Sequence, residues 1–302
     1  MKAVWLAILS KLALLPSALW AADTVSLVNS ESKIGRILGM EHEVLVLSTQ
    51  PIPGLPSVEL RIPKERVAAV GFGADEQRDT FLQNATHRDL PKLAELWKGF
   101  APFLPLQGSP AAQIGLRYGL LLLEAGSGVD RVAPLPIFER IAGIAPSLQQ
   151  QEAAKQGILR TLLRGGQWGR AESEALAMAG AASGAALLAE ARLTAGFVQK
   201  IRLGAFTEEN PRWNRDEFAR PERERLYQST LDHLLGAALV FGAPAELAAR
   251  ARLIALEVYA NEGEASRATA LAEEIMAFHT DSAEAKAALA WLSKQPPQAG
   301  PN

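Results

Sequence analysis

The sequence contains no cysteine and only four histidines among its 302 residues. Without thiols, the chain has no disulfide bonds, no thiol catalysis, no cysteine-ligated zinc and no lipidated N-terminal cysteine. The histidines, His42, His87, His233 and His279, form no paired metal-binding motif on a helix, and none accompanies a serine in a nucleophile elbow. We therefore predict no catalytic residue, no metal site and no cofactor, with an active site assembled from distant residues as the open alternative.

An excess of charge of either sign is also missing. The chain has 31 Lys and Arg against 33 Asp and Glu, a formal net charge of -2, which provides no general attraction to nucleic acid or anionic lipid. A hydrophobic content of 48 % with 21 % charged residues is typical of a globular protein, and the length suffices for one large or two modest domains. Beyond the N-terminus no segment reaches the ~20 apolar residues of a membrane span, so we expect no stable membrane insertion of the mature chain.

Residues 1–22 have the pattern of a secretory signal peptide. Lys2 precedes a mainly apolar run from Ala3 to Trp20, and the small residues Ala21 and Ala22 offer a cleavage site. An uncleaved amphipathic helix or anchor is the alternative, but the run is short and interrupted for a span. We predict an exported protein, periplasmic or secreted.

Residues 23–72 predict a small β-domain, because apolar residues there recur with a period of two between turn-forming clusters. Five short strands in so little chain favour a compact barrel. The apolar positions are Val25 and Leu27, Ile34 and Ile37, Val44 to Leu47, Val58, Leu60 and Ile62, then Val67 and Val70.

The strand sequences Ile34-Gly35-x-Ile37 and Val44 to Leu47 resemble those of small SH3-like barrels of the Sm type. In RNA-binding members, the resemblance implies an acidic residue and an asparagine in the middle loop. Glu41 matches the acid, but Val44 and Leu45 occupy the region where asparagine is expected. We therefore predict no nucleic-acid partner and interpret the domain as a packing or docking module.

Residues 73–294 predict an all-α domain in which short connections make successive helices antiparallel neighbours. The final stretch from Ala245 to Leu292 divides into three helices, with a break at Gly263 and capping side chains at Thr280 to Ser282. Earlier helices are expected over 134–144, 148–164, 168–179 and 184–203.

Two of the helix pairs resemble tetratricopeptide repeats, with Thr280 replacing the terminal proline of the pattern. The first match consists of Tyr259, Gly263, Ala268, Ala272 and Ile275, and the second of Ile158, Leu162, Gly166, Ala171 and Ala175. The resemblance implies an α-solenoid whose stacked hairpins share a core. The expected fold class is thus α+β and multidomain: a small N-terminal β-barrel-like domain followed by an all-α TPR-like helical array.

The stretch from Gly204 to Arg225 interrupts the helical rhythm and is the best candidate for a partner or ligand contact. Tryptophan and arginine are common in binding hot spots. In the opposing interpretation, Trp213 and Phe218 fill the groove of the solenoid while the charges pair on the surface. The candidate contact residues are Arg212, Trp213, Arg215, Phe218 and Arg220.

The sequence as a whole favours a non-catalytic scaffold or adaptor of the cell envelope that binds a protein partner in a helical-repeat groove. The alternative is a small-ligand or glycan-binding protein, with a pocket lined by Arg212, Trp213 and Arg215. An α-helical enzyme acting on envelope polymers ranks third. Residues 295–302 are expected to form a disordered tail.

Overall fold

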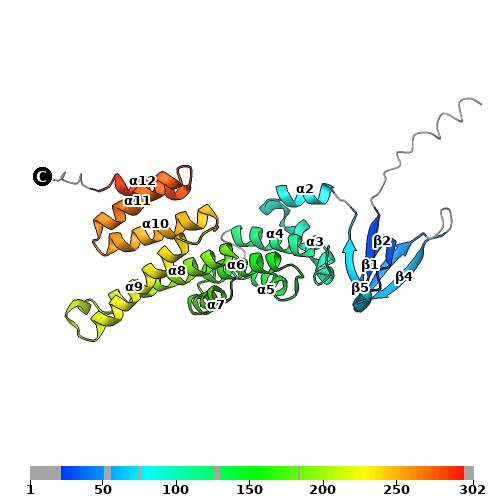
Figure 1. The fold of residues 1–302 in the computed structure, drawn as a ribbon, viewed down its shortest axis with the longest axis horizontal. Coiled ribbons are helices and arrows are strands. Elements are labelled where there is room, and N and C mark those ends of the chain that lie inside the picture. The colour runs from blue at the N-terminus through cyan, green and yellow to red at the C-terminus, as the bar shows by residue number, and fades with distance from the viewer. Residues whose placement is uncertain (1–21, 51–55, 74–75, 126–129, 183, 296–302) are drawn as a thin grey trace, which may run out of the picture. The chain divides into compact units, whose positions relative to one another are not determined.

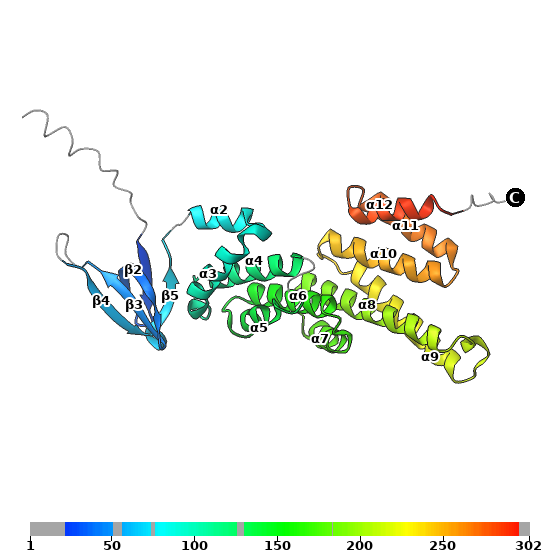
Figure 2. The same cartoon turned by 180° about the vertical axis from the view of Figure 1, so that it is seen from behind.

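The computed structural model describes residues 22–50, 56–73, 76–125, 130–182 and 184–295. The predicted leader and the predicted tail lie outside these residues, except for Ala22 and Gln295. The chain divides into two compact units, one made of the chain up to Ala85 together with Pro105–Pro110, and the other made of Thr86–Leu104 and the chain from Ala111 onward. Figures 1 and 2 show the five strands and the helices that follow them.

The first unit contains a five-stranded antiparallel sheet in the order β4-β3-β2-β1-β5. Its register pairs Val25 with Val70, Ile37 with Leu47 and Leu45 with Ile62. A 3-10 helix, Lys64–Arg66, precedes the last strand, and helix α2, Glu76–Asn84, follows it. The strands are β1 Asp23–Leu27, β2 Ser32–Glu41, β3 Val44–Thr49, β4 Val58–Pro63 and β5 Val67–Gly71. The five predicted strands are therefore confirmed.

The sheet is stabilised by an apolar face and by one carboxylate. Val25, Leu45 and Leu47 are fully buried, as their alternation in the sequence predicts. The two carboxylate oxygens of Asp23 accept hydrogen bonds from the backbone N–H groups of Ile37 and Gly73, each at 2.8 Å. This side chain thus ties the first strand to the second strand and to the chain that leaves the sheet.

A later segment of the chain, Pro105–Pro110, also belongs to the first unit. The backbone N–H of Val70 in β5 donates to the carbonyl of Gln107 at 2.8 Å, and Gln107 forms a parallel bridge with Ala69. Gly108 has φ +77°, and a Cβ there would lie 2.1 Å from the carbonyl oxygen of Val70. Only glycine permits this backbone to approach the edge strand so closely.

The second unit is helical. With α2, the described residues form eleven α-helices, so the α+β class is confirmed. The helices of this unit are α3 Leu90–Phe100, α4 Ala111–Glu124, α5 Leu135–Ile144, α6 Leu148–Arg164, α7 Trp168–Ala181, α8 Ala185–Glu209, α9 Ala219–Ala238, α10 Ala245–Asn261, α11 Ala265–Phe278 and α12 Ala283–Leu292.

Small residues allow these helices to approach one another closely. The Phe138 ring of α5 is fully buried, and a Cβ at either Gly119 of α4 or Gly157 of α6 would lie 2.6 Å from it. A Cβ at Gly196 of α8 would lie 2.7 Å from Leu234 of α9. In both views α8 and α9 lie side by side along much of their length (Figures 1 and 2).

The helix ends follow from local chemistry. Gly166 and Gly263 have φ +69° and +77°, and both occupy the turn of a helical hairpin. Ser282 begins α12 by accepting a hydrogen bond from the N–H of Ala285 at 2.9 Å, as its place in the sequence predicts. Most boundaries of the helices predicted over 134–203 agree with the structure to within two residues, but α8 continues past residue 203 to Glu209.

Candidate functional site

The turn between α8 and α9 contains all but one of the candidate contact residues. It runs from Asn210 to Phe218, with a 3-10 turn at Trp213–Arg215, and Arg220 lies in the first turn of α9. The irregular segment is therefore much shorter than the predicted stretch from Gly204 to Arg225. The two helices extend into that stretch from both sides because their apolar residues pack against each other, with Leu203 and Leu226 in one core cluster.

Local hydrogen bonds hold the shape of the turn. One carboxylate oxygen of Asp216 accepts from the backbone N–H groups of Phe218, at 2.9 Å, and Ala219, at 3.0 Å. The bonds from Ala219 and Phe218 lower the pKa of Asp216 below its ordinary value, because they stabilise the charged carboxylate. Asp216 is therefore ionised at neutral pH and caps the N-terminus of α9, where a negative charge is favourable.

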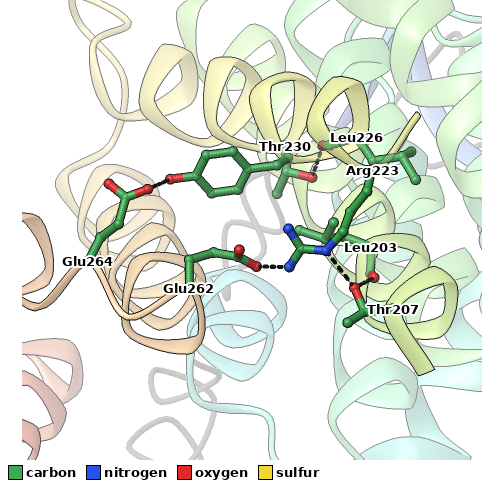
Figure 3. A network of polar contacts seen from close by, with 8 residues as sticks. Leu203, Thr207, Arg223, Leu226, Thr230, Glu262 and Glu264 are labelled. Carbon is green, nitrogen blue, oxygen red and sulfur yellow. Dashed lines mark hydrogen bonds and ion pairs between the residues drawn. The ribbon is translucent and has the colours of Figure 1, made fainter. Parts of the chain in front are cut away.

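Trp213 is anchored by a buried arginine of α9. The guanidinium carbon of Arg223 lies 3.9 Å from the centre of the Trp213 ring, close enough for a cation–π contact. Arg223 is 7 % exposed and donates to the hydroxyl of Thr207 at 3.1 Å and to the carboxylate of Glu262 at 2.5 Å (Figure 3). The charge of Arg223 is thus compensated inside the protein.

A second contact lies one helical turn along α9. The hydroxyl of Tyr227 donates to the carboxylate of Glu264, which also pairs with Arg267 at 2.7 Å. Burial, followed by this hydrogen bond, raises the pKa of Tyr227 well above its ordinary value. Glu262 and Glu264 flank Gly263, so the α10–α11 turn holds two residues of α9 at once. We call these contacts of Arg223 and Tyr227 with Glu262 and Glu264 the α9 network.

The candidate contact residues differ in where their side chains lie. Trp213, Arg215 and Arg220 line an open pocket of about 680 Å³ beside the turn, whereas Arg212 is not among its lining residues. Phe218 is 87 % exposed, so the interpretation that it fills the groove of the solenoid is wrong. The cause is local, because the capping bonds of Asp216 fix the backbone of Phe218 in a position from which its ring extends into solvent.

The same interpretation expected the charges of this region to pair on the surface, and only some of them do. Arg225 pairs with Glu222 at 2.7 Å. Within the described part of the chain, Arg212, Arg215 and Arg220 form no ion pair. The pocket is nonetheless mixed in charge, because Asp216, Glu217 and Glu224 line it too. It therefore offers donors and acceptors side by side, which suits a polar ligand or a protein surface with both signs of charge.

The residues that line a second concave surface were not among the predicted contact residues. This surface is a groove of about 380 Å³ between α9, α10 and α11, which we call the α9–α11 groove. Its lining residues are Leu235, Ala238, Leu239, Arg252, Tyr259, Arg267, Ala270, Leu271 and Glu274. The sequence contained one signal for it: Arg267, Ala270, Leu271 and Glu274 are three, one and three residues apart, and so share one face of α11.

The described residues contain no group of three or more acidic or histidine side chains placed to hold a metal ion. Among their helices, none has the length and apolar character needed to cross a membrane. We compared the chain with models of protein families, with curated proteins and with solved structures, and found no match in any of the three.

Proposed function

We propose that this protein is an exported, non-catalytic scaffold or adaptor of the cell envelope whose helical unit binds a protein partner. The observation that carries the proposal is the α8–α9 turn, which contains the 87 % exposed ring of Phe218 together with Arg212 and Arg215, arginines that form no ion pair among the described residues. Large exposed aromatic rings and arginines are typical of the energetic centres of protein interfaces. The α9 network fixes this turn before a partner arrives, which reduces the entropy lost on binding.

The relation to tetratricopeptide repeats is part of the proposal, and two hairpins support it. In the α6–α7 hairpin the N–H of Gln167 donates to the carbonyl of Leu162, and in the α10–α11 hairpin the N–H of Glu264 donates to that of Tyr259, both at 2.9 Å. Each bond spans a glycine of positive φ and has the form of a Schellman motif.

The second helices of these hairpins also correspond in their buried positions. Ala171 and Ala175 of α7 are fully buried, and so are Ala268 and Ala272 of α11, at the same distances from their turn glycines. Two equivalent hairpins with small buried residues are what a stacked helical repeat requires. An interaction scaffold is a common use of such repeats.

The SH3-like, Sm-like barrel is likewise a proposal. It is supported by the run of neighbouring antiparallel strands from β1 to β4 and by the return of β5 to pair with β1. The short strands and their buried valines and leucines suit a small closed β-domain. In this reading the β-domain packs or docks and binds no nucleic acid.

One specific observation favours a second candidate, a small-ligand or glycan-binding protein. The pocket beside the turn has a volume of about 680 Å³ and is lined by Trp213 and by charged groups of both signs. That volume lies within the range of about 300–1,000 Å³ common for ligand sites.

The test is crosslinking from the α8–α9 turn in the native cell envelope. A photoreactive amino acid replaces Phe218 in one variant and Leu289 in the control, because Leu289 is also exposed, at 56 %, but lies on α12. A partner identified from Phe218 alone is then purified, and its affinity for wild type is compared with that for Arg215→Ala. We expect a loss of about 10-fold or more for this variant, as is typical of a hot-spot arginine.

Two results would contradict the proposal. Equal products from Phe218 and Leu289 would show nonspecific crosslinking rather than a partner site at the turn. If neither position captures a protein, but envelope sugars or small anions quench the tryptophan fluorescence of wild type and not that of Trp213→Phe, the second candidate takes precedence.

A further inference from the structure

The turn between α9 and α10 is apolar and exposed. Its residues, Leu239–Pro244, include none with a charge, although 21 % of the chain is charged. Leu239 is 77 % exposed and Phe241 99 % exposed. Contact of an exposed phenylalanine ring with water is unfavourable, and covering the ring with another surface would lower the free energy.

A surface that could cover it lies on the same molecule. Leu239 is also a lining residue of the α9–α11 groove, which Ala238, Ala270 and Leu271 line too. The small side chains of the two alanines leave room for a ring, and the volume of about 380 Å³ is enough for a large side chain. Phe241 does not fill the groove of its own chain, because its side chain is almost wholly exposed.

The charges at the groove favour an uncharged occupant. Arg252 pairs with Glu274 at 3.3 Å, and Arg267 pairs with Glu264 at 2.7 Å. These arginines are already compensated within the chain, so the groove has little net attraction for a charged peptide. An uncharged, apolar turn such as Leu239–Pro244 is complementary to a groove whose arginines are already paired.

We propose that this protein forms a two-fold symmetric dimer in which Phe241 of each protomer fills the α9–α11 groove of its partner. One surface that carries both a protruding ring and a recess for it is self-complementary, which is the requirement of an isologous interface. The proposal goes beyond the proposed function, because the α8–α9 turn takes no part in it.

The apolar surface available is adequate for such a dimer. Phe278 lies one helical turn beyond Glu274 on the same face of α11 and is 75 % exposed. Covering Leu239, Phe241 and Phe278 on both protomers, at roughly 150–200 Å² for each large side chain, removes on the order of 1,000 Å² from solvent, the lower limit for a specific interface.

The first experiment is sedimentation of wild type and of Phe241→Asp over a range of protein concentrations. Wild type is expected to form a dimer at protein concentrations up to about 100 µM. The variant should bind itself at least about 30-fold more weakly, because it lacks the ring that fills the groove and would place a carboxylate against Ala238, Ala270 and Leu271. Phe218→Asp is the matched control, since it changes an equally large exposed ring at the other end of α9 and should leave the dimer intact.

The second experiment tests the contact itself by mixing two variants. Ala270→Trp fills the groove but keeps Phe241, whereas Phe241→Asp removes the ring but keeps the groove. Neither is expected to dimerise alone, but their mixture retains one complete contact per dimer and should form a heterodimer. Circular dichroism of each variant verifies that it is folded.

The proposal is overturned if wild type remains a monomer, if Phe241→Asp dimerises as well as wild type, or if the mixture shows no more association than its components. A monomeric wild type whose Phe241 crosslinks to a different protein would mean that the turn serves a foreign partner. None of these results bears on the α8–α9 turn, so the two proposals fail independently.

Discussion

Helix α9 is flanked by two turns of opposite character, although each turn exposes a phenylalanine. The turn before it, Asn210–Phe218, contains charges of both signs and is linked by the α9 network to the α10–α11 turn. The turn after it, Leu239–Pro244, has no charge and is held by short-range backbone hydrogen bonds, such as that from the N–H of Ala243 to the carbonyl of Val240 at 3.2 Å.

The comparison shows two ways of presenting an apolar ring to a binding partner. Phe218 is presented by a turn whose neighbours are fixed through side chains distant in sequence. Phe241 is presented by the ends of two helices and a glycine, Gly242, with φ +77°. We therefore expect the first turn to depend on buried polar groups for its shape and the second to depend on its backbone alone.

The largest effect should follow from Arg223→Ala, which breaks the link between the first turn and the α10–α11 turn. The substitution leaves Glu262 without its partner and removes the cation that stacks on Trp213. We expect a loss of about 3 kcal/mol in the free energy of unfolding, because a carboxylate that is 18 % exposed loses its compensating charge. Urea unfolding followed by far-ultraviolet circular dichroism measures the loss.

Two further variants separate charge compensation from general damage to α9. Arg225→Ala removes an exposed arginine of the same helix and should leave the urea midpoint almost unchanged. Arg223→Ala combined with Glu262→Gln should recover part of the stability, because no isolated charge remains. If the double variant is no more stable than Arg223→Ala, the network is not held by charge compensation.

A smaller effect is expected from Tyr227→Phe, which removes only the hydroxyl that donates to Glu264. Losing a hydrogen bond to a charged acceptor should cost about 1.5 kcal/mol in the free energy of unfolding. The variant should also change the response to alkali. The pKa of Tyr227 is raised above its ordinary value of 10.0, so the folded protein holds this proton more tightly than the unfolded chain does.

The contribution of that proton is therefore intact below about pH 10 and is lost progressively as the pH rises above it. Urea midpoints measured from pH 8 to pH 11, roughly spanning the ordinary tyrosine pKa, should fall more steeply for wild type than for Tyr227→Phe. Parallel curves for the two proteins would show that the hydroxyl of Tyr227 is not protected in the folded state.

The smallest effects distinguish the two rings directly. Phe218→Ala should change the free energy of unfolding by less than about 0.5 kcal/mol at any protein concentration, because the ring is already exposed. Phe241→Ala should match wild type in dilute solution and fall below it as the concentration rises, because dimerisation stabilises only wild type. Thermal unfolding at two concentrations decides this, and identical concentration dependence for both variants would remove the distinction between the turns.

Local patterns in the sequence predicted the helices and strands well, because each element depends on the spacing of apolar residues that are near neighbours in sequence. The alternation from Val25 to Val70 and the three apolar faces after Ala245 correspond to strands and helices of the structure. The end of α8 was predicted too early because Gly204 and the polar residues Glu208 and Glu209 interrupt its apolar pattern. Packing against α9 keeps this segment helical, with Phe206 against the core cluster that contains Leu226.

The polar contacts of the candidate site could not be predicted in the same way. Arg223 and Glu262 are far apart in sequence, and only the hairpin geometry brings them together. A partial signal existed, because Arg223 and Tyr227 are four residues apart on α9, and Glu262 and Glu264 flank one turn glycine. The exposure of Phe218 was not predictable from composition either, since it depends on the hydrogen bonds that the N–H groups of Phe218 and Ala219 donate to Asp216.

The segment Pro105–Pro110, which pairs with strand β5, limits how this protein could be divided into fragments. The chain passes from one compact unit to the other three times, after Ala85, after Leu104 and after Pro110. A gene fragment that stops before Gln107 encodes every strand but omits the carbonyl that receives the N–H of Val70. A fragment that does include Gln107 also carries Thr86–Leu104 of the helical unit, so no single cut in the gene separates the two units cleanly.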